Sequence, residues 1–225
     1  YLDCYSSLYA GTPLTLFTQR GKVVAVYTAS TSTPIDADAV VVMGSPTAAT
    51  FHQLTGGAAN FQIVKNRQPI RMSDIKAYDV VTYDEINNTL VVSDLRLTCI
   101  YEDASPNAAT PTSITVLGHT FGVLVSTWET TEGLSIGDSV TLLLTADGKV
   151  AGMAKPSAQT RSNAMGVVTG GTTAKMFLPN GGTLELTGGR SDLSKLTDCL
   201  VTLSSSAKDR LNASRMASGS AAGEF

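Results

Sequence analysis

Histidine is scarce in this chain, which has only His52 and His119 among 225 residues. General acid–base catalysis near neutral pH most often uses His, and neither residue stands in a known catalytic motif. The sequence also lacks the Gly-x-Ser-x-Gly turn that presents a catalytic serine. These absences favour a chain that is not an enzyme, and we assign no catalytic residue.

Charged residues are few as well: they make up 16% of the sequence, and the formal net charge is -3. Nucleic-acid binding needs clustered Lys and Arg to neutralise phosphates, and no long basic run occurs. No apolar stretch has the length of a membrane-spanning helix. We therefore expect neither a nucleic-acid partner nor insertion into a membrane.

Paired cysteines are absent too. Cys4, Cys99 and Cys199 lie far apart and form no Cys-x-x-Cys pair, which argues against a disulfide framework and against a zinc site. Free cysteine behaves as a small apolar residue and is usually buried. We expect each cysteine to sit in a strand in that role.

Calcium is the one metal for which candidate ligands exist. Asp36 and Asp38 are separated by one residue, and a second group of oxygen-bearing side chains lies within residues 102–107. Neither stretch has the ligand spacing of a helix-loop-helix calcium site. We interpret both as solvated loop carboxylates and predict no metal or other cofactor, while a calcium site stays an open alternative.

The sequence is rich in patterns that are typical of β-strands. Runs of alternating and β-branched residues, such as VTLLLTADGKVAGM and KMFLPNGGTLELTG, are separated by Gly, Asn and Asp. Residues that tolerate positive φ mark tight hairpin turns at 87–88, 147–148 and 180–181, and Gly21 does the same in TQRGKV. The pattern predicts an all-β fold with at most short helical turns, at residues 73–78 and 191–196.

A short motif recurs along the chain. Residues 134–142, LSIGDSVTL, are matched by IKAYDVVTY at 75–83, more loosely by residues 8–16, and with one insertion by residues 193–203. In each copy a Leu or Ile precedes a turn, Asp or Thr caps that turn, and a strand follows with Thr facing outward. The spacing predicts four small β-barrel or sandwich units of about sixty residues.

A longer repeat contains the short motif. The sequence of residues 15–27 is similar to that of residues 141–153, and further short matches follow in the same order along both halves of the chain. We predict two β modules, 1–131 and 132–225, each made of two units and incomplete at the outer end. The alternative is one unrelated sandwich with similar hairpins. The tail, 204–225, has lost most of the apolar alternation, so we expect it to be frayed or half-paired. Its end, GSAAGEF, also has the composition of a linker.

Aromatic residues make up only 6% of the chain and include a single tryptophan, Trp128. Flat exposed rings are the usual means by which a β module holds a sugar. Trp128, with Tyr101 or Phe121, is therefore the one candidate ligand platform. The competing interpretation is that these rings pack in the core or between units.

The stretch SDIKAYDVVTYDEINNTLVVSDLRLTCIYEDASPN, followed by PTSITVLGHTF and LSIGDSVTLLLTADGKVAGMAKP, resembles the repeat regions of bacterial surface proteins that carry S-layer-homology anchors. The resemblance spans about residues 61–156. It implies an exported, multi-module chain of Gram-positive anaerobes that projects β-rich repeats from the cell surface. The anchor domain's own signature is absent from this sequence, so no anchoring residue can be assigned.

From these observations we expect a non-catalytic, extracellular structural or spacer repeat of an S-layer-associated protein at the bacterial cell surface. The chain starts without Met and in strand-like sequence, which favours a piece of something longer. The expected partners are other modules of the same polypeptide. The alternative is a recognition module of an adhesin that binds cell-wall glycan, host glycan or a protein.

Overall fold

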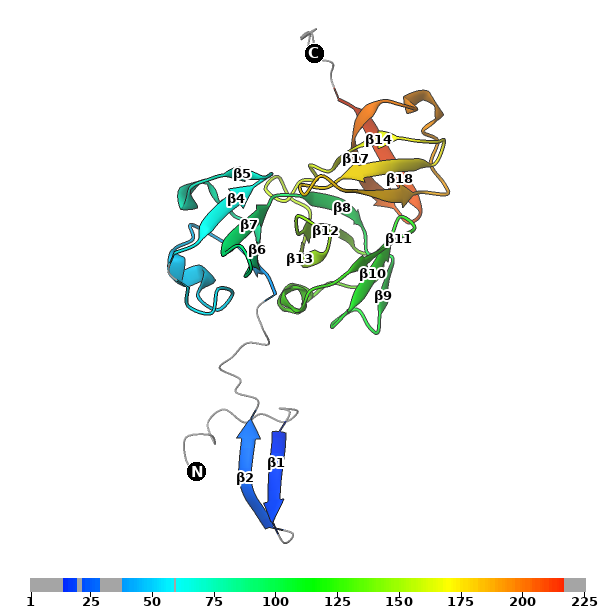
Figure 1. Ribbon diagram of the computed structural model, residues 1–225. Coiled ribbons are helices and arrows are strands. Elements are labelled where there is room, and N and C mark those ends of the chain that lie inside the picture. Colours follow the sequence, from blue (N-terminus) through cyan, green and yellow to red (C-terminus); the bar gives the residue numbers. More distant parts are fainter. Residues whose placement is uncertain (1–13, 20–21, 29–37, 59, 217–225) are drawn as a thin grey trace. The chain divides into compact units, whose positions relative to one another are not determined.

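The computed structural model of the protein describes residues 14–19, 22–28, 38–58 and 60–216 (Figure 1). Strands dominate, and the described helices are short 3-10 turns, which confirms the all-β prediction. The chain divides into two compact units, Tyr1–Ala37 and Asp38–Phe225. Each unit is described separately below.

The described residues of the first compact unit form an antiparallel hairpin of β1 (Leu14–Gln19) and β2 (Lys22–Thr28). Phe17 pairs with Ala25 and Thr18 pairs with Val23, so a bulge lies between these pairs. The predicted hairpin is confirmed, although Gly21, assigned to its turn, lies outside the described residues.

The second compact unit begins with residues 38–93, here called repeat A. Its five-stranded sheet has the order β3-β6-β7-β4-β5. The elements are β3 (Val40–Val41), η2 (Ala48–Phe51), β4 (Gln62–Lys65), β5 (Gln68–Pro69), η3 (Met72–Asp74), β6 (Val80–Asp84) and β7 (Thr89–Ser93). The predicted β6–β7 hairpin turns at Asn88, where φ is 47°.

Residues 94–154, repeat B, form two three-stranded sheets with the orders β13-β12-β8 and β11-β10-β9. The elements are β8 (Arg96–Ile100), β9 (Asp103–Ser105), β10 (Ser113–Val116), β11 (His119–Gly122), η4 (Val125–Thr130), β12 (Ser139–Leu144) and β13 (Val150–Ala154). The predicted hairpin turn at 147–148 is confirmed, because Gly148 has a φ of 87° between β12 and β13.

Residues 163–216, repeat C, form a five-stranded sheet with the order β16-β15-β14-β17-β18. The elements are β14 (Met165–Val168), β15 (Thr173–Phe177), β16 (Thr183–Thr187), η5 (Ser194–Leu196), β17 (Leu200–Ala207) and β18 (Arg210–Arg215). The expectation of a frayed or half-paired tail is wrong for residues 204–215, since they pair along the β17–β18 hairpin. Residues 217–225 lie outside the described residues.

The three repeats share one strand pairing. In each, the first strand runs antiparallel to a later strand that then forms a hairpin, giving the orders β3-β6-β7, β8-β12-β13 and β14-β17-β18. The registers correspond residue by residue. The equivalent pairs are Val41↔Val80, Ile100↔Ser139 and Val167↔Leu200. The repeat predicted from sequence is thus present in the backbone pairing of residues 38–216.

The turn before the hairpin is also shared. In every repeat, one residue shortly before the hairpin's first strand has positive φ. The values are 67° at Tyr78, 98° at Gly137 and 60° at Asp198. The backbone N–H of each of these residues donates to the end of the repeat's first strand, at Val42, Tyr101 and Val168. The recurring motif therefore forms the same turn, at the same place in the sheet, in each of the three repeats. Its copy at residues 8–16 lies largely outside the described residues.

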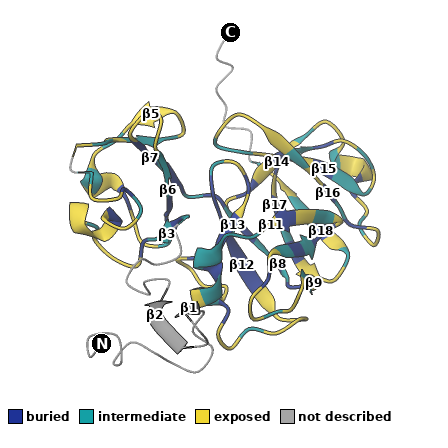
Figure 2. Ribbon diagram, turned by 60° about the horizontal axis from the view of Figure 1, so that its bottom comes forward, coloured by how far each residue is buried: buried dark blue, intermediate teal, exposed yellow. Residues whose placement is uncertain are grey.

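One detail of the motif differs from the prediction. Thr202 faces outward as expected, but Thr141 is fully buried, and its hydroxyl lies 2.9 Å from that of Thr98. The reason is that β12 is a central strand with both faces covered, so Val140 to Leu144 are all buried (Figure 2).

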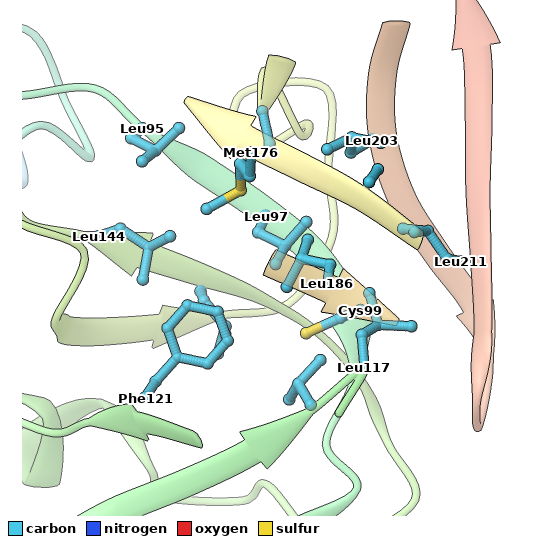
Figure 3. Close-up of a cluster of buried hydrophobic side chains, with 14 of the residues drawn as sticks. Leu95, Leu97, Cys99, Leu117, Phe121, Leu144, Met176, Leu186, Leu203 and Leu211 are labelled. Atoms are coloured by element: carbon cyan, nitrogen blue, oxygen red, sulfur yellow. The ribbon is translucent and has the colours of Figure 1, made fainter. Parts of the chain in front are cut away.

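Repeats B and C share a hydrophobic core. Leu97 and Cys99 of β8 and Phe121 of β11 meet Met176 and Leu186 of β15 and β16 (Figure 3). Repeat A has its own smaller core, which includes Phe51, Leu90 and Val92. A third cluster joins Ala39 and Val80 of repeat A to Leu143 and Ala151 of repeat B. Buried contacts therefore run through all three repeats.

The barrel alternative is wrong for the described sheets, since none of them closes. In repeat C, β18 comes near β16 but does not pair with it. The Leu211 N–H donates to Ser191 Oγ, and the Arg190 N–H donates to the Asp209 carbonyl oxygen, so the residues after β16 lie between the two strands. The predicted module boundary between residues 131 and 132 stays a prediction; the two compact units of the structure divide at Ala37 and Asp38.

Candidate functional site

The sheet of repeat C presents an exposed apolar face, which we call the outer face of repeat C. Side chains alternate across a strand, so Gly166, Val168 and Met176 face the core while their neighbours point outward. The outer face consists of Met165, Val167, Lys175, Phe177, Glu185, Leu200 and Thr202. Met165 is 43% exposed, Phe177 40% and Leu200 49%.

Two hollows adjoin this face and share Asn163 and Met165. The larger, of about 590 Å³, is lined by Thr98, Pro156, Ser157, Arg161, Ser162, Asn163, Met165, Thr202, Leu203, Ser204 and Ser214. The smaller, of about 290 Å³, is lined by Asn66, Arg67, Asp94, Leu95, Asn163, Met165, Phe177, Leu178 and Pro179. Apolar side chains thus lie at the centre of a surface whose rim is polar.

The larger hollow lacks the residues of acid–base chemistry, because no His, Cys, Asp or Glu lines it. Several of its polar groups already bond within the chain. Ser162 Oγ lies 3.0 Å from the Arg96 carbonyl oxygen and 2.8 Å from that of Leu203, and Asn163 Nδ2 donates to the Asp94 carbonyl oxygen at 2.8 Å. These hydrogen bonds tie the loop between β13 and β14 to β8 and β17.

A buried ion-pair network lies where repeats A and B meet. Asp79 is only 1% exposed, and its carboxylate lies 3.1 Å from Lys65 Nζ and 3.4 Å from an Arg96 guanidinium nitrogen. Lys65 also pairs with Asp94 at 2.9 Å. Burial acts to lower the pKa of Lys65, but the hydrogen bonds and charges of Asp94 and Asp79 outweigh it and raise that pKa. Arg96 extends the network by donating to the Gln159 carbonyl oxygen.

The predicted aromatic platform is not assembled on the surface. Tyr101 and Phe121 are both fully buried in the core that repeats B and C share, so neither ring face is open to a ligand in this structure. Trp128 is half-buried in η4, and its Nε1 donates to the Pro111 carbonyl oxygen at 2.9 Å. Contact of Trp128 with a ligand stays a prediction.

Neither the two histidines nor the two described cysteines line the hollows beside the outer face of repeat C. His52 is exposed beside the turn that contains Gly57, and His119 stands edge-on to Phe121 with ring centroids 4.6 Å apart. Cys99 is buried in β8, as predicted, and Cys199 is half-buried just before β17. Cys4 lies outside the described residues.

Two of the candidate calcium carboxylates, Asp38 and Glu102, accept hydrogen bonds from the backbone. Asp38 accepts from the N–H groups of Val125 and Ser126 at the start of η4, at 2.7 and 3.3 Å. Glu102 accepts from the Asp209 N–H at 3.0 Å. Asp36 lies outside the described residues. Within the described part of the chain, no group of three or more His, Cys, Asp or Glu side chains is placed to hold a metal ion.

Comparisons of this chain with models of protein families, with curated proteins and with solved structures find no match. No helix within the described ranges is long and apolar enough to cross a membrane.

Proposed function

We propose that this chain is a non-catalytic structural segment, a spacer built of repeated β units. The observation that carries the proposal is the shared pairing of repeats A, B and C, in which β6, β12 and β17 hold equivalent central positions. Repetition of one unit with buried contacts between neighbours is how elongated proteins are built.

The contacts between neighbouring repeats support a mechanical role. Repeats B and C share one core, and repeats A and B are joined by the cluster around Val80 and Leu143. The Asp79 network adds two ion pairs between repeats A and B, from Lys65 to Asp94 and from Asp79 to Arg96. Because these groups are largely withdrawn from water, a relative movement of the repeats would expose apolar surface and separate charges.

The cell-surface setting belongs to the same proposal and rests on the sequence. The stretch from about residue 61 to 156 resembles repeat regions of S-layer-associated surface proteins, which implies an extracellular location on a bacterium. Other modules of the same polypeptide would then be the principal partners. In that setting the array would hold a distal module away from the wall.

A recognition module of an adhesin is the second candidate, and the two hollows beside the outer face of repeat C favour it. Together they offer Arg161 and several hydroxyl groups around the exposed Met165 side chain. Binding pockets of proteins usually combine apolar contact with a few polar groups. A glycan or a protein segment is the class of ligand that such a surface would take.

Binding of the full chain to isolated Gram-positive cell walls and to a glycan panel separates the two candidates. A spacer shows no saturable binding, although the chain melts cooperatively. Saturable binding that Trp128→Ala or Arg161→Ala abolishes, while Ile86→Ala leaves it intact, would replace the spacer with the recognition module. Ile86 suits the control because it is 94% exposed and belongs to repeat A.

A further inference from the structure

The contact between repeats A and B joins two different parts of the repeat. Repeat A contributes Val41 and Val80, where its first strand pairs with its central strand. Repeat B contributes Leu143 and Ala151, in the β12–β13 hairpin. A Cβ at Gly152 of this hairpin would lie 2.8 Å from Val41 Cγ2, so the two surfaces pack tightly. We call the positions of Val41 and Val80 the front patch of a repeat, and those of Leu143, Ala151 and Gly152 the hairpin patch.

The front patch of repeat C is apolar and open. The register that pairs Val41 with Val80 in repeat A pairs Val167 with Leu200 in repeat C. In repeat B the position of Val80 is held by the polar residue Ser139. Val80 is 1% exposed beneath repeat B, whereas Leu200 is 49% exposed. Repeat C therefore presents the apolar surface that repeat A uses for its contact.

The β1–β2 hairpin of the first compact unit repeats the backbone register of β12–β13. Phe17 pairs with Ala25 as Leu143 pairs with Gly152, and in both hairpins a bulge follows directly. The adjoining sequence also agrees, since residues 15–16 and 141–142 are both Thr-Leu. The positions of the hairpin patch are therefore held in β1–β2 by three apolar residues, Phe17, Val24 and Ala25.

Repeats A and C have polar residues in the hairpin patch. The position of Leu143 is held by Asp84 in repeat A and by Ser204 in repeat C. Apolar front patches thus occur in repeats A and C, and apolar hairpin patches in repeat B and in β1–β2. The front patch of repeat A already packs on the hairpin patch of repeat B. The front patch of repeat C and the β1–β2 hairpin remain as the second pair of the same kind.

We propose that the front patch of repeat C is a docking surface for the β1–β2 hairpin of a second copy of this chain. The contact continues, from one copy to the next, the packing already formed between repeats A and B. Ala25 replaces Gly152 and Leu200 replaces Val80, so the two surfaces meet through larger side chains and lie somewhat farther apart than in the contact within the chain.

Docking of this kind is directional. It joins two different patches, so each copy that is bound through one patch still carries the other, and copies add end to end. A two-stranded hairpin is only marginally stable by itself, and packing on an apolar surface stabilises it. The proposal does not depend on the spacer function, because it rests on the strand registers and on which patches are apolar.

Sedimentation equilibrium of the full chain, over concentrations from micromolar to millimolar, tests the proposal. We expect the unaltered chain to associate reversibly. Leu200→Asp in the front patch and Phe17→Asp in the hairpin patch should each weaken association by on the order of tenfold or more, because each places a charge in an apolar contact. Ile86→Asp is the matched control, since Ile86 is an apolar residue of repeat A that is 94% exposed. It should leave association unchanged.

An equimolar mixture of the two patch variants is the sharper test. The Leu200→Asp chain keeps its hairpin patch and the Phe17→Asp chain keeps its front patch, so the mixture should form a heterodimer although neither variant associates alone. Each variant supplies the patch that its substitution leaves intact, so a local loss of structure at the altered patch does not prevent the result. Thermal unfolding shows whether repeat C stays folded, and Met165→Asp serves if Leu200→Asp unfolds it.

Three results would overturn the proposal. The first is an unaltered chain that stays monomeric at every concentration. The second is association that Phe17→Asp weakens no more than Ile86→Asp does, because the hairpin is then not the occupant. The third is a mixture of the patch variants that associates no more than each variant alone, because the two patches then do not meet between copies.

Discussion

Asp79 and Asp138 take the same position in successive repeats, 59 residues apart. Each carboxylate accepts a hydrogen bond from the backbone N–H three residues earlier, at 3.1 Å from Lys76 and 2.8 Å from Ser135. Each backbone N–H donates in return to the carbonyl oxygen of that same residue. The two side chains differ in what surrounds them, because Asp79 is buried among cations and Asp138 is exposed.

Replacing these two residues by Ala should have unequal effects. Asp138→Ala removes one turn-capping hydrogen bond, and we expect a loss of about 1 kcal/mol in the free energy of unfolding. Asp79→Ala also leaves Lys65 and Arg96 with fewer partners in a largely buried site, and we expect a loss of about 3 kcal/mol. Urea denaturation measures both. Equal losses would mean that the ion-pair network contributes nothing to the junction of repeats A and B.

Gly166 of β14 lies where no side chain fits. A Cβ at this position would overlap the Lys175 carbonyl oxygen of the neighbouring strand and lie 2.8 Å from Leu203 Cδ1. We expect Gly166→Ala to lower the free energy of unfolding by about 2 kcal/mol, because β14 must move away from β15.

Gly122→Ala, in β11, is the control for this substitution. The closest atom to a Cβ there is Lys149 Cγ, at 3.9 Å, which is an ordinary contact. This variant should be neutral or up to about 1 kcal/mol more stable, as Ala replaces Gly in a strand. The packing described for repeat C is contradicted if both variants unfold at the same urea concentration.

Cys99 and Cys199 should differ in reactivity toward thiol reagents. Burial of Cys99 in β8, with a smaller contribution from the charge of Glu102, raises the pKa of its thiol far above the ordinary value of 9.0. The reactive thiolate is therefore almost absent at neutral pH, and the core excludes the reagent. Cys199 is half-buried. Peptide mapping after brief treatment with N-ethylmaleimide should show modification of Cys199 well before that of Cys99; equal rates would contradict the shared core of repeats B and C.

His119 should make the stability of the chain sensitive to acid. Burial lowers the pKa of its imidazole below the usual 6.5, so the folded chain binds this proton less readily than the unfolded chain does. The contribution of His119 to stability is therefore present above pH 6.5 and is lost as the pH falls through the folded pKa. Denaturation of the unaltered chain and of His119→Gln, across this range, measures it. A constant difference between the two, with no drop below pH 6.5, would contradict the buried environment.

The strand pattern and the repeat could be predicted from sequence because both depend on local chemistry. Alternation of apolar residues marks β6 and β17, and Asn88 and Gly148 tolerate the positive φ of a hairpin turn. The Asp of the recurring motif caps its turn at Asp79 and Asp138 as expected. In the copy near β17 the positive φ falls on Asp198 itself.

Burial of particular side chains was harder to predict, since it depends on which sheets cover each other. Thr141 was expected outside and is buried, because β12 has neighbours on both faces. Tyr101 and Phe121 were considered for a platform on the basis of their position along the chain, yet their rings fill the core. The outer face of repeat C gave no local signal: Met165, Phe177 and Leu200 are apolar like core residues, and only the register of β14, β15 and β17 shows that they point outward.

Repeats A, B and C should behave as one mechanically continuous segment. Pulsed electron paramagnetic resonance between spin labels at Ile86→Cys in repeat A and Glu185→Cys in repeat C tests it most directly, with Cys4 and Cys199 replaced by Ser and the buried Cys99 left in place. We expect one narrow distance distribution, which Asp79→Ala broadens. A broad distribution in the chain with Asp79 intact would contradict it, because repeats that move freely cannot hold a distal module at a fixed distance.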